Sequence, residues 1–457
     1  MKRPIGAVIL AAGDGKRMKS VKPKPMLEVL FRPMVDWVFD AAVGAEVAEV
    51  CVVCAPGDLM VKYFEGRAQT VVQRERLGTG HAVLQARTFI ESLRGGDVVV
   101  LNGDIPLCTG QTVKAAIDCH RTAQNDATVI TAQVKDPAGY GRIVRGESGI
   151  SRIVEHKDAD DETLAICEIN SGAYVFTADA LLDALDRLSN HNAAGEYYLT
   201  DTIELILAAG GKAGAFDAQD ERVILGANDP WQLYELNKTA NEAVLRAHAE
   251  NGVRFISLDG IIIAADAKIG ADTTILPGTV IKSGCIIGAG CIIGPNTILE
   301  HSRVGSGSTL NSSQVYYSRV GDHVTIGPFT QIRPGCDIKD NAKVGDFVEV
   351  KNSVVGEKTS IAHLTYIGDS DVGSGVNFGC GVVTVNYDGK NKARTAIGDN
   401  AFVGCNANLI APVTVGNGAY VAAGTTVTDD VPAGDMAIGR TRQTNKKGYA
   451  KGRFQKK

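Results

Sequence analysis

The stretch IGADTTILPGTVIKSGCIIGAGCII, residues 269–293, decides the fold of the C-terminal half, because an isoleucine returns in it at every sixth position. Aliphatic residues keep the same interval over 320–350 and again over 397–427. A period of six fits neither an amphipathic helix nor an alternating strand. It is typical of the hexapeptide β-helix, in which each repeat is a short strand and a turn. Three repeats make one triangular coil, so we expect residues eighteen positions apart to stack.

The composition limits the class of protein. The chain has 457 residues, too many for one core, so two or three domains are expected. A net charge of −5 argues against nucleic-acid binding. No secretory signal or membrane-spanning stretch is visible, which predicts a cytoplasmic protein without a membrane partner. Cys51 and Cys54 have the spacing of a metal or redox pair, but they lie in an apolar run and are expected to be buried thiols.

Three regions follow one another along the chain. Residues 1–228 alternate strand and helix patterns, with helical spacing at 34–42, 81–93 and 112–123, which predicts a Rossmann-like α/β domain with a mostly parallel sheet. Residues 229–250 read as a linker helix, and 251–457 as the β-helix domain. The end of that domain, from Arg440, holds eight Lys or Arg and no acidic residue. This basic tail is either a solvated end or a binding segment for an anionic ligand.

A glycine-rich loop follows the first predicted strand. In Leu10–Met18, LAAGDGKRM, the residues Gly13 and Gly15 allow a turn that points backbone N–H groups at a phosphate chain. Arg17 and Lys24 add positive charge to the same region. Asp104 ends a later apolar run, where a carboxylate can hold Mg²⁺ together with phosphate oxygens and waters. These residues favour a site that binds phosphates.

Several motifs together resemble those of the sugar-1-phosphate nucleotidyltransferases. They are LAAGDGKRM with Pro23-Lys24, QRERLGTGHA at 73–82, LNGD at 101–104, GYGR at 139–142, EHK at 155–157 and NSG at 170–172. The resemblance is strongest to the bifunctional bacterial enzymes that make UDP-N-acetylglucosamine, and it covers almost the whole chain. It implies Asp104 and Asn228 as ligands of Mg²⁺, and Arg17 and Lys24 as catalytic cations. It implies nucleotide-sugar contacts at Leu10, Ala11, Gly13, Lys24, Gln73, Gly78, Thr79, Gly141, Glu155, Asn170 and Asn228. Of these, Gln73, Gly78 and Thr79 belong to the segment at 73–82 that would recognise the base, and Gly141, Glu155 and Asn170 would contact the sugar.

The β-helix carries a second candidate site around His363. A neutral imidazole can take a proton from an attacking amine near pH 7, although a lone His on a β-helix is more often a surface or stacking residue. The resemblance implies His363 as the general base, and Glu349 is expected to orient it. It implies glucosamine 1-phosphate contacts at Arg333, Lys351, Tyr366, Asn377 and Lys392, and acetyl-CoA contacts at Cys380, Asn386, Tyr387, Cys405, Ala423 and Arg440. Cys380 and Cys405 depart from the family, where Ala and Ser are common at these positions.

The resemblance implies two reactions on one chain. The C-terminal domain would acetylate glucosamine 1-phosphate with acetyl-CoA, and the N-terminal domain would transfer UMP from UTP to N-acetylglucosamine 1-phosphate, which supplies cell-wall precursors. It also implies a homotrimer of left-handed β-helices. Two alternatives remain open. A single-function nucleotidyltransferase would use the β-helix only for assembly, and a regulatory scaffold would have lost Lys24 or Asp104, both of which are present.

Overall fold

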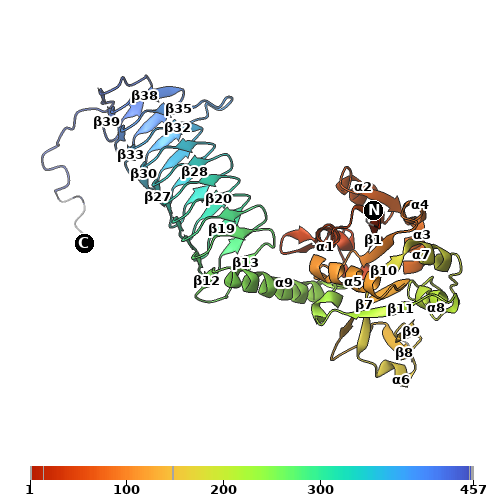
Figure 1. The fold of residues 1–457 in the computed structure, drawn as a ribbon. Coiled ribbons are helices and arrows are strands. Elements are labelled where there is room, and N and C mark those ends of the chain that lie inside the picture. The colour runs from red at the N-terminus through yellow and green to blue at the C-terminus, as the bar shows by residue number, and fades with distance from the viewer. Residues whose placement is uncertain (1–2, 14, 147–148, 452, 454–457) are drawn as a thin grey trace. The chain divides into compact units, whose positions relative to one another are not determined.

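The computed structural model describes residues 3–13, 15–146, 149–451 and 453 (Figure 1). The chain divides into two compact units, residues 1–240 and 241–457. The division falls within α9 (Pro230–Glu250), at the place where the sequence predicts a linker helix.

The first unit is built on one mixed sheet with the strand order β11-β7-β10-β6-β1-β4-β5. The strands are β1 (Ile5–Ala11), β4 (Glu49–Cys54), β5 (Gln69–Val72), β6 (Asp97–Asn102), β7 (Ala127–Gln133), β10 (Glu168–Thr177) and β11 (Ala213–Asp217), with β8 (Arg142–Gly146) and β9 (Gly149–Val154) at the side. A small hairpin, β2 (Glu28–Val29) and β3 (Arg32–Pro33), lies apart from this sheet. β1 runs parallel to both β4 and β6, whereas β10 is antiparallel to its neighbours.

Helices cover both faces of this sheet. They are α1 (Met34–Gly44), α2 (Asp58–Tyr63), α3 (Thr79–Gln85), α4 (Arg87–Ser92), α5 (Gly110–Thr122), α6 (Asp161–Leu164), α7 (Ala178–Leu185) and α8 (Asp201–Ala208). One apolar cluster packs α3, α4, α7 and α8 on one face, and a second packs α1 and α5 on the other. Alternate residues of β1 and β6 enter opposite clusters, as strand geometry requires.

The predicted α/β class is confirmed, with one local difference. The pattern over 81–93 predicts one helix, but the structure has α3 and α4, which meet at Ala86. Cys51 and Cys54 are buried on β4, and burial raises the pKa of the Cys51 thiol to about 12. Such thiols are inert packing groups, as the apolar run predicts.

The second unit is the predicted β-helix, with three parallel stacks of very short strands. The first stack holds β12 (Arg254–Phe255), β15 (Thr274–Ile275), β18 (Ile292–Ile293), β21 (Thr309–Leu310), β24 (Thr325–Ile326), β27 (Lys343–Asp346), β30 (Ser360–His363), β33 (Asn377–Phe378), β36 (Phe402–Val403), β39 (Tyr420–Val421) and β41 (Met436–Ala437). The second holds β13 (Ile262–Ile263), β16 (Val280–Ile281), β19 (Ile298–Glu300), β22 (Gln314–Tyr316), β25 (Gln331–Ile332), β28 (Glu349–Lys351), β31 (Tyr366–Gly368), β34 (Val383–Val385), β37 (Asn408–Ile410) and β40 (Thr426–Val427). The third holds β14 (Lys268–Ile269), β17 (Ile286–Ile287), β20 (Arg303–Val304), β23 (Arg319–Val320), β26 (Asp337–Ile338), β29 (Val354–Val355), β32 (Ser370–Val372), β35 (Thr395–Ile397) and β38 (Val413–Val415).

The aliphatic residues of the six-residue repeat form one continuous core. Thr274 pairs with Ile292, eighteen positions on, as three repeats per coil predict. The offset rises to 25 between Asn377 and Phe402, because the chain leaves the coil after β34 and returns at β35. That excursion, residues 386–394, is the loop that interrupts the repeat in the sequence. Among the described residues, no helix is both long and apolar enough to span a bilayer.

Candidate functional site

Two adjoining cavities in the first unit lie beyond the carboxyl ends of β1 and β6, where ligands bind in parallel sheets. Both cavities are lined by Leu10, Lys24, Thr79, Asn102 and Asp104. Leu10 and Asn102 come from the ends of the two strands, and Asp104 follows in the next turn. These five residues form a wall that both cavities share, so one elongated ligand that lies along this wall can occupy both cavities.

Lys24 stands at the centre of this wall. Its Nζ lies 2.5 Å from Oδ2 of Asp104 and 2.8 Å from Oδ1 of Asn228. Only 10% of the Lys24 side chain is exposed. Gly15 has φ of +56°, and a Cβ there would lie 2.7 Å from Cβ of Lys24, so the glycine-rich loop closes directly onto this lysine. The loop therefore fixes one cation between two oxygen donors.

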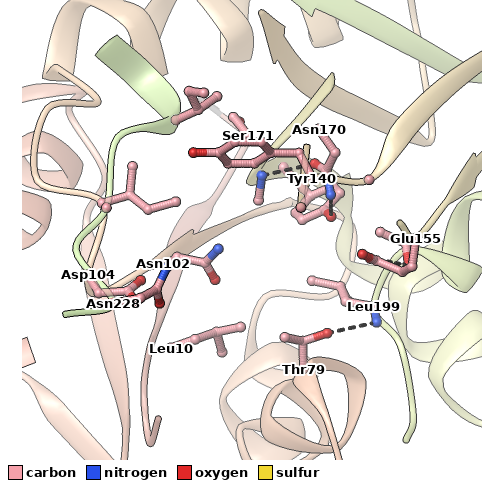
Figure 2. Close-up of a pocket in the computed structure, with 18 of the residues that line it drawn as sticks. Leu10, Thr79, Asn102, Asp104, Tyr140, Glu155, Asn170, Ser171, Leu199 and Asn228 are labelled. Carbon is pink, nitrogen blue, oxygen red and sulfur yellow. Dashed lines mark hydrogen bonds between the residues drawn. The ribbon is translucent and has the colours of Figure 1, made fainter. Parts of the chain in front are cut away.

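Asn228 is held in place from the first turn of α9. Its backbone N–H donates to Oε1 of Gln232 at 2.8 Å, and the Gln232 backbone N–H donates to Oδ1 of Asp229 at 2.8 Å. Figure 2 shows Asp104 and Asn228 together on one side of the pocket, with Glu155 on the opposite side. The two predicted metal ligands are thus brought together, although 124 residues separate them.

The first cavity gathers the residues predicted to contact a sugar, Gly141, Glu155 and Asn170. The Thr200 hydroxyl donates to Oε1 of Glu155 at 3.1 Å, and the Asn170 amide donates to the Tyr174 hydroxyl at 2.6 Å. Burial raises the pKa of Glu155 despite the bond from Thr200. A buried carboxylate such as Glu155, which accepts a hydrogen bond from Thr200, gains more from a further hydroxyl donor than an exposed one would.

Asp201 adds a second perturbed carboxyl next to this cavity. Burial, and then the negative charge of Glu155, raise the pKa of Asp201 to about 6. Asp201 begins α8, directly after Thr200, which lines the cavity. Two acidic groups, Glu155 in the lining and Asp201 beside it, therefore lie close to each other at the first cavity.

The second cavity contains the predicted base-recognition residues Gln73, Gly78 and Thr79. The Gln73 amide nitrogen donates to the Gly78 carbonyl at 3.2 Å, which leaves its amide oxygen for a ligand. Gly78 has φ of +107°, and a Cβ there would lie 2.5 Å from the Tyr197 carbonyl oxygen. Only glycine fits this close approach. Oγ1 of Thr79 accepts a bond from the backbone N–H of Leu199 at 3.0 Å (Figure 2).

Two predicted residues do not line either cavity in the described part of the chain. Arg17 is exposed and is absent from the lining that the described residues form, and the Ala11 side chain is buried in the core. Two of the lining residues that were not predicted carry polar side chains inside quoted motifs. Asn102 borders both cavities, and Arg76 borders the second, where its Nε donates to the Ala12 carbonyl at 3.1 Å. Both lie inside quoted motifs, but sequence alone does not show which motif side chains turn inward.

The two oxygen donors that contact Lys24, from Asp104 and Asn228, suit Mg²⁺. Within the described part of the chain, no group of three or more His, Cys, Asp or Glu is placed to hold a metal. Mg²⁺ needs no such group, since it commonly takes one or two protein oxygens and completes its shell with waters and phosphates. One carboxylate, Asp104, and one amide oxygen, Asn228, meet that need.

In the second unit, the predicted catalytic residue stands in a vertical column of one residue per coil. Asp346 pairs with His363 in the register of β27 and β30. Counting on from the registers Ile361↔Phe378, Phe378↔Val403 and Val403↔Val421 places Cys380, Cys405 and Ala423 on the coils above. The predicted general base and three predicted acetyl-CoA contacts therefore share one edge of the β-helix.

The partner of His363 is Asp346, which corrects the expectation that Glu349 orients this ring. Nδ1 of His363 contacts Oδ1 of Asp346. Glu349 belongs to the neighbouring stack, in register with Tyr366, and its Oε1 accepts from Nη1 of Arg333 at 2.8 Å. Glu349 thus belongs to a different stack from His363 and is engaged by Arg333.

Three predicted phosphate-binding cations gather near Asp369. Nζ of Lys351 lies 3.6 Å from Oδ2 of Asp369, and the Asn386 amide bonds the same carboxylate. The adjacent Lys351 ammonium lowers the pKa of Lys392, and the charge of Arg333 acts in the same direction. Like charges held this close favour binding of an anion.

The remaining predicted contacts lie on or near the same edge. Nη1 of Arg440 donates to the carbonyl oxygen of Ala423, so the start of the basic tail returns to the column. The Tyr387 hydroxyl donates to the Gly389 carbonyl at 2.7 Å, within the loop that leaves the coil. Asn377 and Cys405 are exposed, and Tyr366 and Cys380 are half-buried. The last residues of the tail, 454–457, lie outside the described residues.

The chain is similar to known transferases over both units. Residues 6–234 match the nucleotidyl transferase family, and residues 266–301, 317–352 and 394–429 match the bacterial transferase hexapeptide repeats. The chain is 48% identical over 445 residues to the bifunctional protein GlmU of Acetivibrio thermocellus, with 97% of this chain and 96% of the relative covered. It is 48% identical over 452 residues to that of Caldanaerobacter subterraneus subsp. tengcongensis, with 98% of each covered. It is 47% identical over 451 residues to that of Thermoanaerobacter pseudethanolicus, with 98% of each covered.

Proposed function

The chain belongs to the family of bifunctional GlmU proteins, and from that premise we propose that it makes UDP-N-acetylglucosamine in two steps. The second unit transfers an acetyl group from acetyl-CoA to glucosamine 1-phosphate. The first unit then joins N-acetylglucosamine 1-phosphate to UMP from UTP and releases pyrophosphate. Its product is a precursor of the cell wall.

One observation carries the first activity: the two cavities meet at Lys24 and Asp104. A nucleotide sugar has a base at one end, a sugar at the other and phosphates between them. Gln73 and Gly78 suit the base, and Glu155 and Asn170 suit the sugar hydroxyls. The shared wall then coincides with the reacting phosphates, where positive charge is needed.

The nucleotidyl transfer needs no covalent protein group. An oxygen of the sugar phosphate attacks the α-phosphorus of UTP, and the bond to pyrophosphate breaks. Lys24 neutralises phosphate charge, and Gln73, Glu155 and Asn170 hold the two ends of the reacting pair in line. Asp104 and Asn228 would hold Mg²⁺, which supplies further neutralisation of phosphate charge when bound.

The acetyl transfer is proposed for the column around His363. The amine of glucosamine 1-phosphate attacks the thioester carbon of acetyl-CoA, the carbon–sulfur bond breaks, and the coenzyme thiolate takes up a proton. Nε2 of His363 accepts the proton that the amine loses. Arg333, Lys351 and Lys392 bind the sugar phosphate, and Cys380, Cys405, Ala423 and Arg440 lie along the donor.

We also propose a cytoplasmic homotrimer. The second unit exposes large apolar side chains on neighbouring coils, including the stacked pair Phe329 and Phe347 at 60% and 57% exposure and Leu364 at 57%. Phe347 and Leu364 directly follow Asp346 and His363 in sequence. A surface of this kind is usually covered by another subunit. Light scattering of the purified protein tests the trimer, and a monomer would contradict it.

Both activities are tested on one preparation by supplying glucosamine 1-phosphate, acetyl-CoA, UTP and Mg²⁺ and omitting each in turn. Asp104→Ala is expected to abolish pyrophosphate release and to spare acetyl transfer, and His363→Ala should do the reverse. If His363→Ala left acetyl transfer intact, the β-helix would serve assembly alone and the single-function alternative would hold. If Asp104→Ala left nucleotidyl transfer within tenfold of the parent, Asp104 would have no place in the mechanism.

A further inference from the structure

The contact between Asp346 and His363 is built into the stacking of the coils. β27 and β30 are neighbouring parallel strands, and their register sets Asp346 directly opposite His363. The Leu364 backbone N–H donates to the Asp346 carbonyl at 3.0 Å, and the Thr365 hydroxyl donates to the His363 carbonyl at 2.7 Å. The backbone on both sides of the pair is therefore fixed, and the imidazole is held by a carboxylate on the preceding coil.

We propose that Asp346 is a positioning residue for His363, so that the two form a carboxylate–imidazole dyad in the acetyl-transfer site. This inference rests on the proposed function of the second unit. An ionised carboxylate only accepts hydrogen bonds, so the ring nitrogen that faces Asp346 carries the proton. The tautomer is then fixed with hydrogen on Nδ1 and a lone pair on Nε2. That is the form a general base needs, and it is the role of the aspartate in serine-hydrolase triads.

The surroundings keep Asp346 ionised. The hydrogen bond to His363 is the main cause that lowers the pKa of Asp346, and the charge of Lys343 on the same strand adds to it. A depressed carboxyl pKa means that the contact is present at neutral pH and is lost only in acid, as pH falls through that pKa. The next coil carries no charged residue in β33, which holds Asn377 and Phe378. Cys380 follows this strand and occupies the register position above His363.

The other nearby carboxylate is already engaged. Glu349 accepts from Arg333 at 2.8 Å on the adjoining stack, where it limits the charge of the cation cluster rather than orienting the ring. The two acidic residues therefore have separate tasks. Asp346 fixes the base, and Glu349 fixes one of the cations that would receive the phosphate.

The test uses Asp346→Ala and Asp346→Asn in the full-length protein. The alanine removes both charge and acceptor, whereas the asparagine keeps an oxygen that can accept from Nδ1. Asp337→Asn is a matched control, because Asp337 has 36% of its side chain exposed against 35% for Asp346 and pairs with Lys339 at 2.6 Å. Because the first unit is expected to fold by itself, folding of each variant is checked by the calorimetric melt of the β-helix, compared with the parent, rather than by nucleotidyl transfer.

Two readouts separate positioning from mere structure. The first is the ¹⁵N spectrum of the His363 ring without substrates, assigned by its loss in His363→Gln, which reports the tautomer. We expect the Nδ1–H form in the parent and in Asp346→Asn, and a mixture in Asp346→Ala. The second is the kinetics of acetyl transfer. We expect kcat to fall about ten- to hundredfold in Asp346→Ala, part of the usual contribution of a general base, with KM for the sugar phosphate nearly unchanged and partial recovery in Asp346→Asn.

The outcomes distinguish this inference from the proposed function. If the tautomer is the same in Asp346→Ala as in the parent, or if kcat does not fall, Asp346 is not a positioning residue. If the parent protein transfers no acetyl group at all, the proposed function of the second unit fails. The ring spectrum still decides whether the dyad exists, because it requires no substrate.

Discussion

Replacing Lys24 by methionine should move metal binding and catalysis in opposite directions. In the structure the Lys24 ammonium lies between Asp104 and Asn228, at 2.5 and 2.8 Å from their oxygens, which is the position a divalent cation would need. A metal ion that enters the protein alone must first displace this ammonium. Lys24→Met keeps most of the side-chain volume and leaves both oxygens available. Metal binding by the substrate-free protein should therefore tighten, although nucleotidyl transfer should fall because the phosphates lose a cation.

The size of the effect follows from the contact. Two unit charges 2.5 Å apart attract by about 7 kcal/mol at an effective dielectric constant of 20, which is a ceiling because both groups lose hydration. Hydrogen bonds to charged groups retain a net value of about 1.5–3 kcal/mol after that loss. Since about 1.4 kcal/mol corresponds to a factor of ten, the metal dissociation constant should fall by roughly ten- to a hundredfold.

The assay is a calorimetric titration of the substrate-free protein with Mg²⁺, repeated with Mn²⁺. Lys22→Met is the matched control, because Lys22 lies two residues away, is 56% exposed and pairs with Glu28 at 3.1 Å. It removes the same charge from the same loop but no ligand of the site, so it should change metal affinity little. An unchanged or weaker affinity in Lys24→Met would refute the reasoning, since the ammonium would then not compete with the metal. If metal affinity rose equally in Lys24→Met and Lys22→Met, the cause would be the loss of net positive charge and not the removal of a competing ammonium.

Three further predictions concern stability and domain structure. Ile332→Ala should lower the free energy of unfolding of the β-helix by about 2–5 kcal/mol in a calorimetric melt, because Ile332 is fully buried between Val315 and Val350. Ile292 is 46% exposed, so Ile292→Ala should lower it far less. Asp201→Asn should stabilise the protein by on the order of 1 kcal/mol at pH 7.5, allowing for solvent screening, and hardly at pH 4. The reason is that folding raises the pKa of Asp201 from the ordinary 3.8 to about 6, so the parent protein loses stability as the pH rises from 3.8 to 6. If Asp201→Asn shifted the melting temperature equally at pH 4 and pH 7.5, this reasoning would be wrong. Residues 1–250 alone should fold and release pyrophosphate from UTP and N-acetylglucosamine 1-phosphate, since residues 1–240 form a compact unit, and a folded but inactive fragment would mean that the first site is incomplete.

The fold was largely predictable because its signals are periodic. The six-residue repeat places one aliphatic side chain on each short strand, and the structure packs these side chains from all three stacks into one continuous core. Ile332 and Val350 could therefore be placed in register from the sequence. The α/β unit was predictable for a similar reason, since its apolar strands alternate with helical patterns. The break at Ala86 was not, because it arises from local backbone geometry within an unbroken apolar pattern.

The sites were predictable as sets of residues but not as contacts. Motifs identify Lys24, Asp104 and Asn228, yet nothing in the sequence shows that the lysine contacts both of the others, which lie 80 and 204 positions further along the chain. The sequence also suggested the wrong partner for His363, Glu349 in place of Asp346, because it does not show which residues are in contact. Glu349 lies fourteen residues before His363 and Asp346 seventeen, and only the second spacing returns to the same edge of the coil. The repeat predicts coils of eighteen residues, whereas the structure has an offset of seventeen between β27 and β30, and this one-residue difference sets Asp346 opposite His363.

The same counting explains how a repetitive scaffold forms an asymmetric site. Each coil contributes one side chain to a given column, so the order Asp346, His363, Cys380, Cys405 and Ala423 is a line of functional groups spaced by the distance between neighbouring strands, about 4.8 Å. A long, thin acetyl donor laid along this edge would meet its contacts in succession, with the base at one end. The proposed acceptor, a sugar phosphate, is short and anionic, so its site needs positive charge. Arg333 and Lys351 on the adjoining stack and Lys392 in the loop at 386–394 would supply that charge. The loop adds seven residues to one coil without disturbing the core, because Asn377 and Phe402 still pair across it. In the proposed acetyl-transfer site, the repeat would thus supply the contacts to the donor, and the loop at 386–394 would supply Lys392 to the acceptor.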